Sequence, residues 1–175
     1  RNPAQHVGTF PLPNTELDRF TLTIELQYPA PADETAIAAR QLVTHPVDDI
    51  EPVVSVEDVC EAQSAVSHLF IDATVIDYVV GLIGSARKHP SVSAGPSTRA
   101  TMATINMARA HAVLSGREFT TPDDVRAVLG PVLAHRLTDE GVSHGVVNVP
   151  EIVAAVVRRV PVGSSGQPTP ERPSS

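Results

Sequence analysis

The fold is decided by the stretch TTPDDVRAVLGPVLAHRL, residues 120–137. Thr121 is a typical helix-capping residue, and Pro122 suits the first helical position because proline lacks the N–H that this position leaves unpaired. Two aspartates follow, where the positive end of the helix dipole favours acidic side chains. Apolar residues then recur at helical spacing. The stretch therefore predicts a helix over residues 122–136.

Similar signals predict helices on both sides of this one. Ser55 is followed three residues later by Asp58, which is close to a capping box, and Asp72 can cap the helix that follows it. Gly116 is placed to end the helix that precedes residue 120. We expect these further helices at residues 33–44, 55–68, 72–88, 97–116 and 149–160.

The composition favours packed helices. Hydrophobic residues make up 42% of the 175 residues, but aromatic residues only 3%, with no tryptophan, so the core must consist of Ala, Val, Leu and Ile. The net charge of −7 and the lack of a basic stripe exclude a nucleic-acid footprint. The longest apolar run, YVVGLIG, is too short to span a membrane. We expect a mainly α, soluble, cytoplasmic protein.

The two ends of the chain differ from its helical middle. Residues 20–26, FTLTIEL, alternate apolar and polar side chains and predict one strand. The prolines of YPAPAD then break this pattern, which places a domain boundary near Tyr28. The sequence from Pro161 onward is rich in Pro, Ser and Gly and predicts a disordered tail. We expect a core end at 1–28, a helical domain at 29–160 and a tail at 161–175.

The sequence lacks the residue patterns of a phosphate-binding loop and of a metal site. The only lysine, Lys88, stands in ARKHP and not in a phosphate-binding Gly-Lys-Ser/Thr loop. No histidine or cysteine pair has the spacing of metal ligands, so we expect no metal site. The single cysteine, Cys60, lies in a helical pattern and is expected to be a small core residue.

One arginine stands in an unusual place. The stretch AGPSTRA, residues 94–100, opens the helix expected at 97–116 and puts Arg99 in its first turn. A helix N-terminus already carries partial positive charge, so a cation there is unfavourable by itself. Arg99 therefore predicts an anion close to the start of this helix.

These segments, taken in order, resemble the C-terminal half of a MoxR-type AAA+ ATPase. The matching pieces are NP (2–3), GTFPLP (8–13), LDRF (17–20), TLTIEL (21–26), YP (28–29) and GPSTRA (95–100). The pieces DYVVGLIGSARKHP and REFTTPDDVRAVLGPVLAHRL, on either side of GPSTRA, extend the resemblance. It implies the last strand and loops of an α/β nucleotide-binding core, followed by a helical lid.

The resemblance also implies roles for three residues. Asn2 matches the sensor-1 asparagine that positions water near the γ-phosphate, and Arg19 matches the arginine finger that reaches a neighbouring subunit's nucleotide. Arg99 matches the sensor-2 arginine of the lid, which contacts phosphate. The implied cofactors are ATP and Mg²⁺, both held through the rest of the protein, and the implied assembly is a hexameric ring with a von Willebrand factor A-type partner.

Two hypotheses of function follow. In the first, the chain is part of an ATP-driven, chaperone-like remodelling protein and is inactive by itself, because it lacks the phosphate loop and the Mg²⁺-binding acid. The alternative is a helical interaction module whose arginines bind no phosphate.

Overall fold

The computed structural model describes residues 12–41, 47, 50–138 and 148–163. The helices in these ranges are α1 (Asn14–Leu17), α2 (Pro31–Gln41), α3 (Val56–His68), α4 (Ala73–Arg87), α5 (Thr98–Leu114), α6 (Pro122–Leu133) and α7 (Val149–Arg159). The six helices predicted from the sequence are confirmed, with ends shifted by a few residues. None of the described helices is long and apolar enough to cross a membrane.

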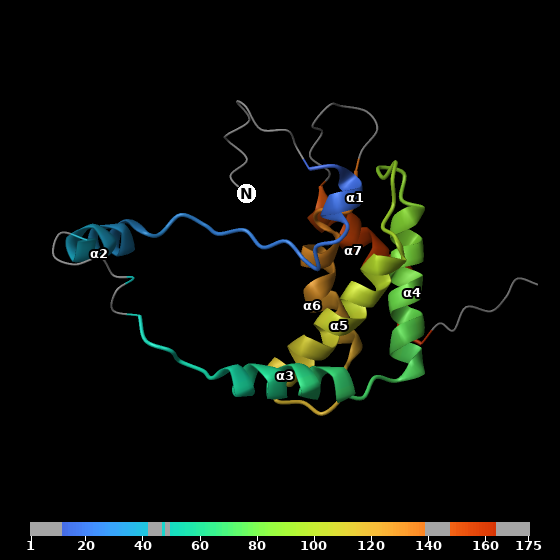
Figure 1. The fold of residues 1–175 in the computed structure, drawn as a ribbon. Helices are drawn as coiled ribbons and strands as arrows, with labels where there is room; N and C mark the ends of the chain where they lie inside the picture. The colour runs from blue at the N-terminus through green and yellow to red at the C-terminus, as the bar shows by residue number, and fades with distance from the viewer. Residues whose placement is uncertain (1–11, 42–46, 48–49, 139–147, 164–175) are drawn as a thin grey trace, which may run out of the picture. The chain divides into compact units, whose positions relative to one another are not determined.

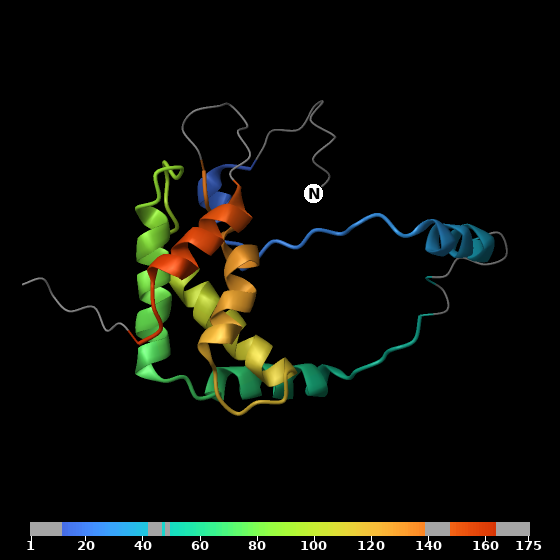
Figure 2. The same cartoon turned by 180° about the vertical axis from the view of Figure 1, so that it is seen from behind.

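The described residues fall into two compact units. The larger unit holds the residues up to Thr23 and those from Val66 onward, and the smaller unit holds those between Ile24 and Ala65. In the larger unit α4, α5 and α6 pack side by side (Figure 1), and the view from behind shows α7 crossing this group (Figure 2).

The core of the larger unit consists of aliphatic side chains, as the composition predicts. Its fully buried residues include four alanines, which allow the helix backbones to approach closely. Larger Leu, Ile and Val side chains fill the space between α4, α6 and α7. The hydrophobic residues of this core with no exposed surface are Val79, Leu82, Ile83, Ala86, Ala100, Ala108, Ala112, Val125, Leu129, Val132 and Leu133.

The helix starts follow the predicted capping chemistry. Asp72 Oδ1 accepts the Thr74 N–H at 2.8 Å, and Gly116 has a positive φ of 69° just after α5, as helix-ending glycines do. At the start of α6, the side chains of Thr121 and Asp124 form a capping box.

The Asp124 carboxylate is buried and holds α5 to α6. It accepts hydrogen bonds from the Arg117 guanidinium, from Thr121 and, at 2.6 Å, from His111 Nδ1 of α5. Burial raises the pKa of this carboxyl, but the hydrogen bonds from Arg117, His111 and Thr121 outweigh burial and hold the pKa well below its usual range.

The prediction of a strand at residues 20–26 is wrong, because the structure has no strand there. Residues 22–30 run in an extended path without a strand assignment, and Ile24 and Leu26 are 73% and 91% exposed. A strand is stable only when a neighbour pairs with its N–H and C=O groups, and no described segment lies alongside as such a neighbour. The alternating pattern alone therefore forms no sheet.

In the smaller unit, the predicted capping box at the start of α3 is confirmed. Asp58 Oδ2 accepts the Ser55 N–H at 2.8 Å, and the Asp58 N–H donates to Ser55 Oγ at 3.0 Å. The prediction for Cys60 is wrong, because its thiol is exposed. Neither α2 nor α3 has a buried residue, so helical spacing alone did not bury Cys60.

The chain that follows α1 is fastened to the end of α6. The Thr23 N–H donates to the Pro131 carbonyl at 2.9 Å, and Thr23 Oγ1 lies 2.8 Å from His135 Nδ1. His135 Nε2 lies 2.9 Å from the Phe20 carbonyl, to which it donates in the neutral tautomer. Burial lowers the pKa of His135, and the nearby Arg136 charge lowers it further, so the folded chain favours the neutral ring.

We predict that Asp124→Ala destabilises the larger unit by about 3 kcal/mol, because it leaves the donors of Arg117, His111 and Thr121 without their shared acceptor. The neighbouring Asp123→Ala is the matched control. Asp123 is exposed and pairs with Arg126, so its loss should cost at most about 1 kcal/mol. Urea unfolding measures both, and equal effects would contradict the role given to Asp124.

A second prediction concerns pH. Because the pKa of His135 is lowered from 6.5, the stabilisation from its neutral ring is complete above pH 6.5 and is lost as the pH falls through the lowered pKa. The wild-type chain should therefore lose more stability between pH 7.5 and pH 5 than the His135→Gln variant does. Thermal unfolding at several pH values measures the difference, and parallel curves would contradict it.

Candidate functional site

The N-terminus of α5 is held in a fixed position against α4. Gly95 lies so close to α4 that an added Cβ would stand 2.8 Å from the Arg87 Cα, so this position requires glycine. Pro96 is fully buried, and its carbonyl accepts a hydrogen bond from Arg87 Nε at 2.7 Å. Ser97 then caps the helix, because its Oγ accepts the Arg99 N–H at 3.1 Å.

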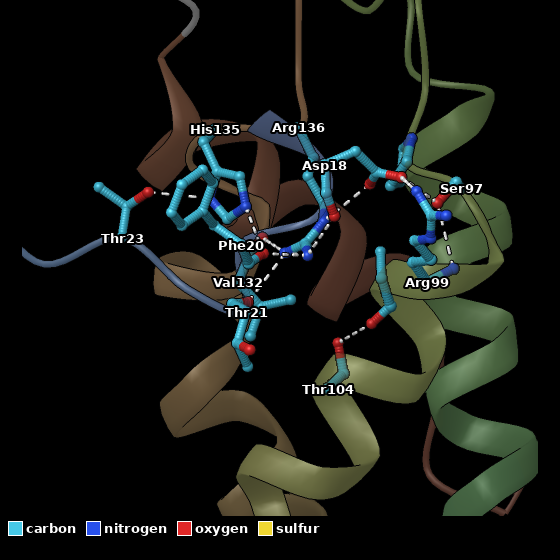
Figure 3. A network of polar contacts seen from close by, with 12 residues as sticks. Asp18, Phe20, Thr21, Thr23, Ser97, Arg99, Thr104, Val132, His135 and Arg136 are labelled. Carbon is cyan, nitrogen blue, oxygen red and sulfur yellow. Dashed lines mark hydrogen bonds and ion pairs between the residues drawn. The ribbon is translucent and has the colours of Figure 1, made fainter. Parts of the chain in front are cut away.

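An anion does lie at this helix start, and it is the carboxylate of Asp18. Ser97 Oγ donates to Asp18 Oδ2 at 2.8 Å, and Arg99 Nη1 lies 3.8 Å from the same oxygen (Figure 3). The Arg99 side chain is nevertheless 61% exposed. Its guanidinium has five donors and makes one long contact here, so it remains able to bind a second anion.

The other oxygen of Asp18 faces Arg136. Arg136 Nε donates to Asp18 Oδ1 at 3.0 Å, and the Arg136 side chain is only 2% exposed. Burial raises the pKa of Asp18, but hydrogen bonds from Ser97 and Arg136 and the charges of Arg136 and Arg99 lower it below its usual range. Asp18 therefore stays ionised at neutral pH and connects three side chains from α5 and the end of α6.

An open pocket of about 380 Å³ lies beside this cluster. Three arginines line it, together with two threonines, an asparagine and apolar side chains of α5. Its lining residues are Asp18, Arg19, Thr21, Thr98, Arg99, Met102, Ala103, Asn106 and Arg136. The guanidinium groups outnumber the one carboxylate, so the pocket is suited to a ligand with negative charge.

The structure brings together two of the three predicted site residues. Arg19 and Arg99 both line the pocket, although they are 80 positions apart in the sequence. The Arg19 side chain is 63% exposed and makes a long ion pair with Glu16 at 3.7 Å. Asn2 lies outside the described residues.

Arg136 is a residue of this pocket that the sequence reasoning missed. It stands between His135 and Leu137 near the end of a helical pattern, where a basic residue is expected simply to favour the helix C-terminus. The signal available was its place beside the buried Val132, Leu133 and Leu137, because an arginine among core positions needs partners.

The pocket fits the phosphate part of the implied cofactor better than its metal. Exposed guanidinium donors beside a capped helix N-terminus are the groups that bind phosphate oxygens. Within the described ranges, no group of three His, Cys, Asp or Glu side chains could hold a metal ion. None of the described residues is therefore assigned to Mg²⁺.

Comparisons with known proteins agree with this arrangement. Residues 84–156 match the model of the AAA lid domain. Protein YeaC of Bacillus subtilis is 34% identical over 171 residues, which cover 94% of this chain and 52% of YeaC. Chaperone MoxR1 of Mycobacterium tuberculosis is 34% identical over 146 residues, which cover 78% of this chain and 38% of MoxR1.

A solved structure shares the fold. The crystal structure of a candidate ATPase from Cytophaga hutchinsonii superposes with a TM-score of 0.78 and 25% identity, and covers 93% of this chain and 52% of that protein. The chain thus spans about half the length of YeaC and of this ATPase, and less of MoxR1. With its match to the AAA lid domain and its MoxR-named relatives, the chain is similar to the C-terminal region of MoxR-type AAA+ proteins.

Proposed function

We propose that the chain belongs to a protein that binds and hydrolyses ATP in a ring of identical subunits, and that the pocket between Arg19 and Arg99 receives nucleotide phosphate. The observation that carries this proposal is the position of two exposed guanidinium groups on one pocket. A phosphate group has several oxygens that accept hydrogen bonds from a planar guanidinium, so each of these arginines can bind nucleotide phosphate.

Each arginine has a separate role in this proposal. Arg99 acts as sensor 2: it exchanges its long contact with Asp18 for contacts with phosphate, while the Ser97 cap keeps the helix start in place. Arg19 acts as an arginine finger on a nucleotide bound by the neighbouring subunit. Its exposure and its weak ion pair with Glu16 leave it free to reach across an interface.

The remaining parts of the proposal rest on the family. Asn2 is the sensor-1 residue, Mg²⁺ is held by residues outside this chain, and the ring is a cytoplasmic hexamer that works as a chaperone with a von Willebrand factor A-type partner. Residues 1–28 complete the nucleotide-binding core and residues 29–160 form the lid, while the tail predicted at 161–175 lies outside the described residues from residue 164 onward. The chain by itself hydrolyses no ATP.

A variant of Arg99 distinguishes this function from that of a helical interaction module. In the full-length protein, Arg99→Ala should weaken ATP binding about tenfold or more, because a hydrogen bond to a charged group contributes about 1.5–3 kcal/mol. Arg158→Ala removes a charge from an exposed part of α7 and should leave the affinity unchanged. Titration calorimetry measures both, and unchanged affinity for the Arg99 variant would favour the interaction module.

If Arg19 is an arginine finger, its loss should impair ATP hydrolysis at the site of the neighbouring subunit. Arg19→Ala should lower the hydrolysis rate about 10³-fold or more while each subunit still binds ATP, because a finger acts on the charge of the transition state. Mixing this variant with subunits disabled in their own phosphate loop should restore part of the activity, since some interfaces then pair an intact loop with an intact finger.

The control for this experiment is the Arg158→Ala protein, which should hydrolyse ATP at the wild-type rate. The mixed rings are verified by native mass spectrometry. Mixed rings that recover no activity at any ratio would mean that Arg19 does not act across subunits.

A further inference from the structure

Arg136 is a buried cation whose donors are used almost entirely by one short segment. Nε donates to the Asp18 carboxylate at 3.0 Å, Nη1 to the Thr21 carbonyl at 3.0 Å, and Nη2 to the Asp18 carbonyl at 3.0 Å. Nη2 also donates to the Phe20 carbonyl, and Nη1 to the Val132 carbonyl of α6. All five N–H groups of the guanidinium thus have an acceptor.

These acceptors lie on both sides of Arg19 in the sequence. The carbonyls of residue 18 and residue 20 both accept from Nη2, so the backbone is fixed immediately before and immediately after the proposed finger. The side chain of Arg19 itself is not held in this way, because it is 63% exposed and its ion pair with Glu16 is 3.7 Å long. Arg136 therefore fixes the base of Arg19 and leaves its guanidinium free.

The same contacts set the spacing between the two pocket arginines. Asp18 uses Oδ1 for Arg136 and Oδ2 for Ser97, the residue that caps the helix carrying Arg99 (Figure 3). The position of Arg19 relative to Arg99 therefore depends on the Asp18 carboxylate, and the orientation of this carboxylate depends on Arg136. A buried ion pair is weak evidence for stability, because removing both charges from water is costly, but its geometry is specific.

We propose that Arg136 is the positioning residue for Arg19: by holding residues 18–21 on the end of α6 it places the finger at the pocket, and Asp18 links that placement to the start of α5. This inference rests on the proposed function of Arg19. Arg136 touches no phosphate in this role, since its donors are occupied by the chain itself.

Mixing variants of the full-length protein tests on which side of the subunit interface Arg136 acts. Arg136→Gln should bind ATP with wild-type affinity and lose hydrolysis by about 10²-fold or more, since the finger contributes about 10³ to 10⁵. Mixed with subunits disabled in their phosphate loop, it should recover activity. Mixed with Arg19→Ala, it should recover none, because both variants lack the same side of the interface.

A defect in folding or in the subunit's own nucleotide site gives a different pattern. If Arg136 served the subunit's own nucleotide, the mixture of Arg136→Gln with Arg19→Ala would recover activity, and this result would overturn the proposal. Wild-type hydrolysis by Arg136→Gln would overturn it as well. Arg126→Gln, which removes an exposed cation of α6 that pairs with Asp123, is the matched control and should retain full activity.

Two further measurements keep the test decisive. If Arg136→Gln forms no rings, Arg136→Lys replaces it, because lysine keeps the charge but cannot reach the separate acceptors of the planar guanidinium. The same loss and the same mixing pattern are expected, and full activity with lysine would overturn the proposal. If Arg19→Ala itself keeps wild-type activity, the proposed function fails, whereas a normal finger defect with a silent Arg136 variant refutes this inference alone.

Discussion

The arrangement of the site depends on the ion pair between Asp18 and the buried Arg136. Residues 18–23 are attached to the helices of the larger unit by this pair, by the bonds from Arg136 to the carbonyls of residues 18, 20 and 21, by the Ser97 hydroxyl, and by contacts with His135 and the Pro131 carbonyl. The pair joins groups 118 positions apart and fixes where the end of one segment meets the ends of two helices. Because Asp18 also accepts from Ser97, one carboxylate determines the relative positions of Arg19 and Arg99.

The charge balance at this point explains how the pocket remains receptive to anions. Asp18 is the carboxylate among the pocket's lining residues. It makes a 3.0 Å ion pair with Arg136, whose side chain is buried. Arg99 is left with a 3.8 Å contact and Arg19 with a 3.7 Å contact, both at exposed groups where ion pairs contribute little. Two cations are therefore available at low cost to an incoming ligand, although the chain as a whole carries a net charge of −7.

The sequence predicts local structure well where the chemistry is local. Thr121 and Asp72 cap their helices as their positions indicated, because a capping bond joins residues two or three positions apart. The strand at residues 20–26 was wrong because a strand depends on a neighbour that its own pattern does not supply. The role of Arg136 was missed for the same reason, since its partners lie 115 to 118 positions away. Arg99 predicted an anion correctly, but the anion in the chain is Asp18, which no local pattern identified.

The most direct test of this account is a structure of the assembled full-length protein with a non-hydrolysable ATP analogue. The account predicts that guanidinium nitrogens of Arg19 and Arg99 lie about 3 Å from phosphate oxygens, while Arg136 keeps its bonds to residues 18–21. A nucleotide bound with its phosphates remote from this pocket, and Arg99 still paired only with Asp18, would contradict it.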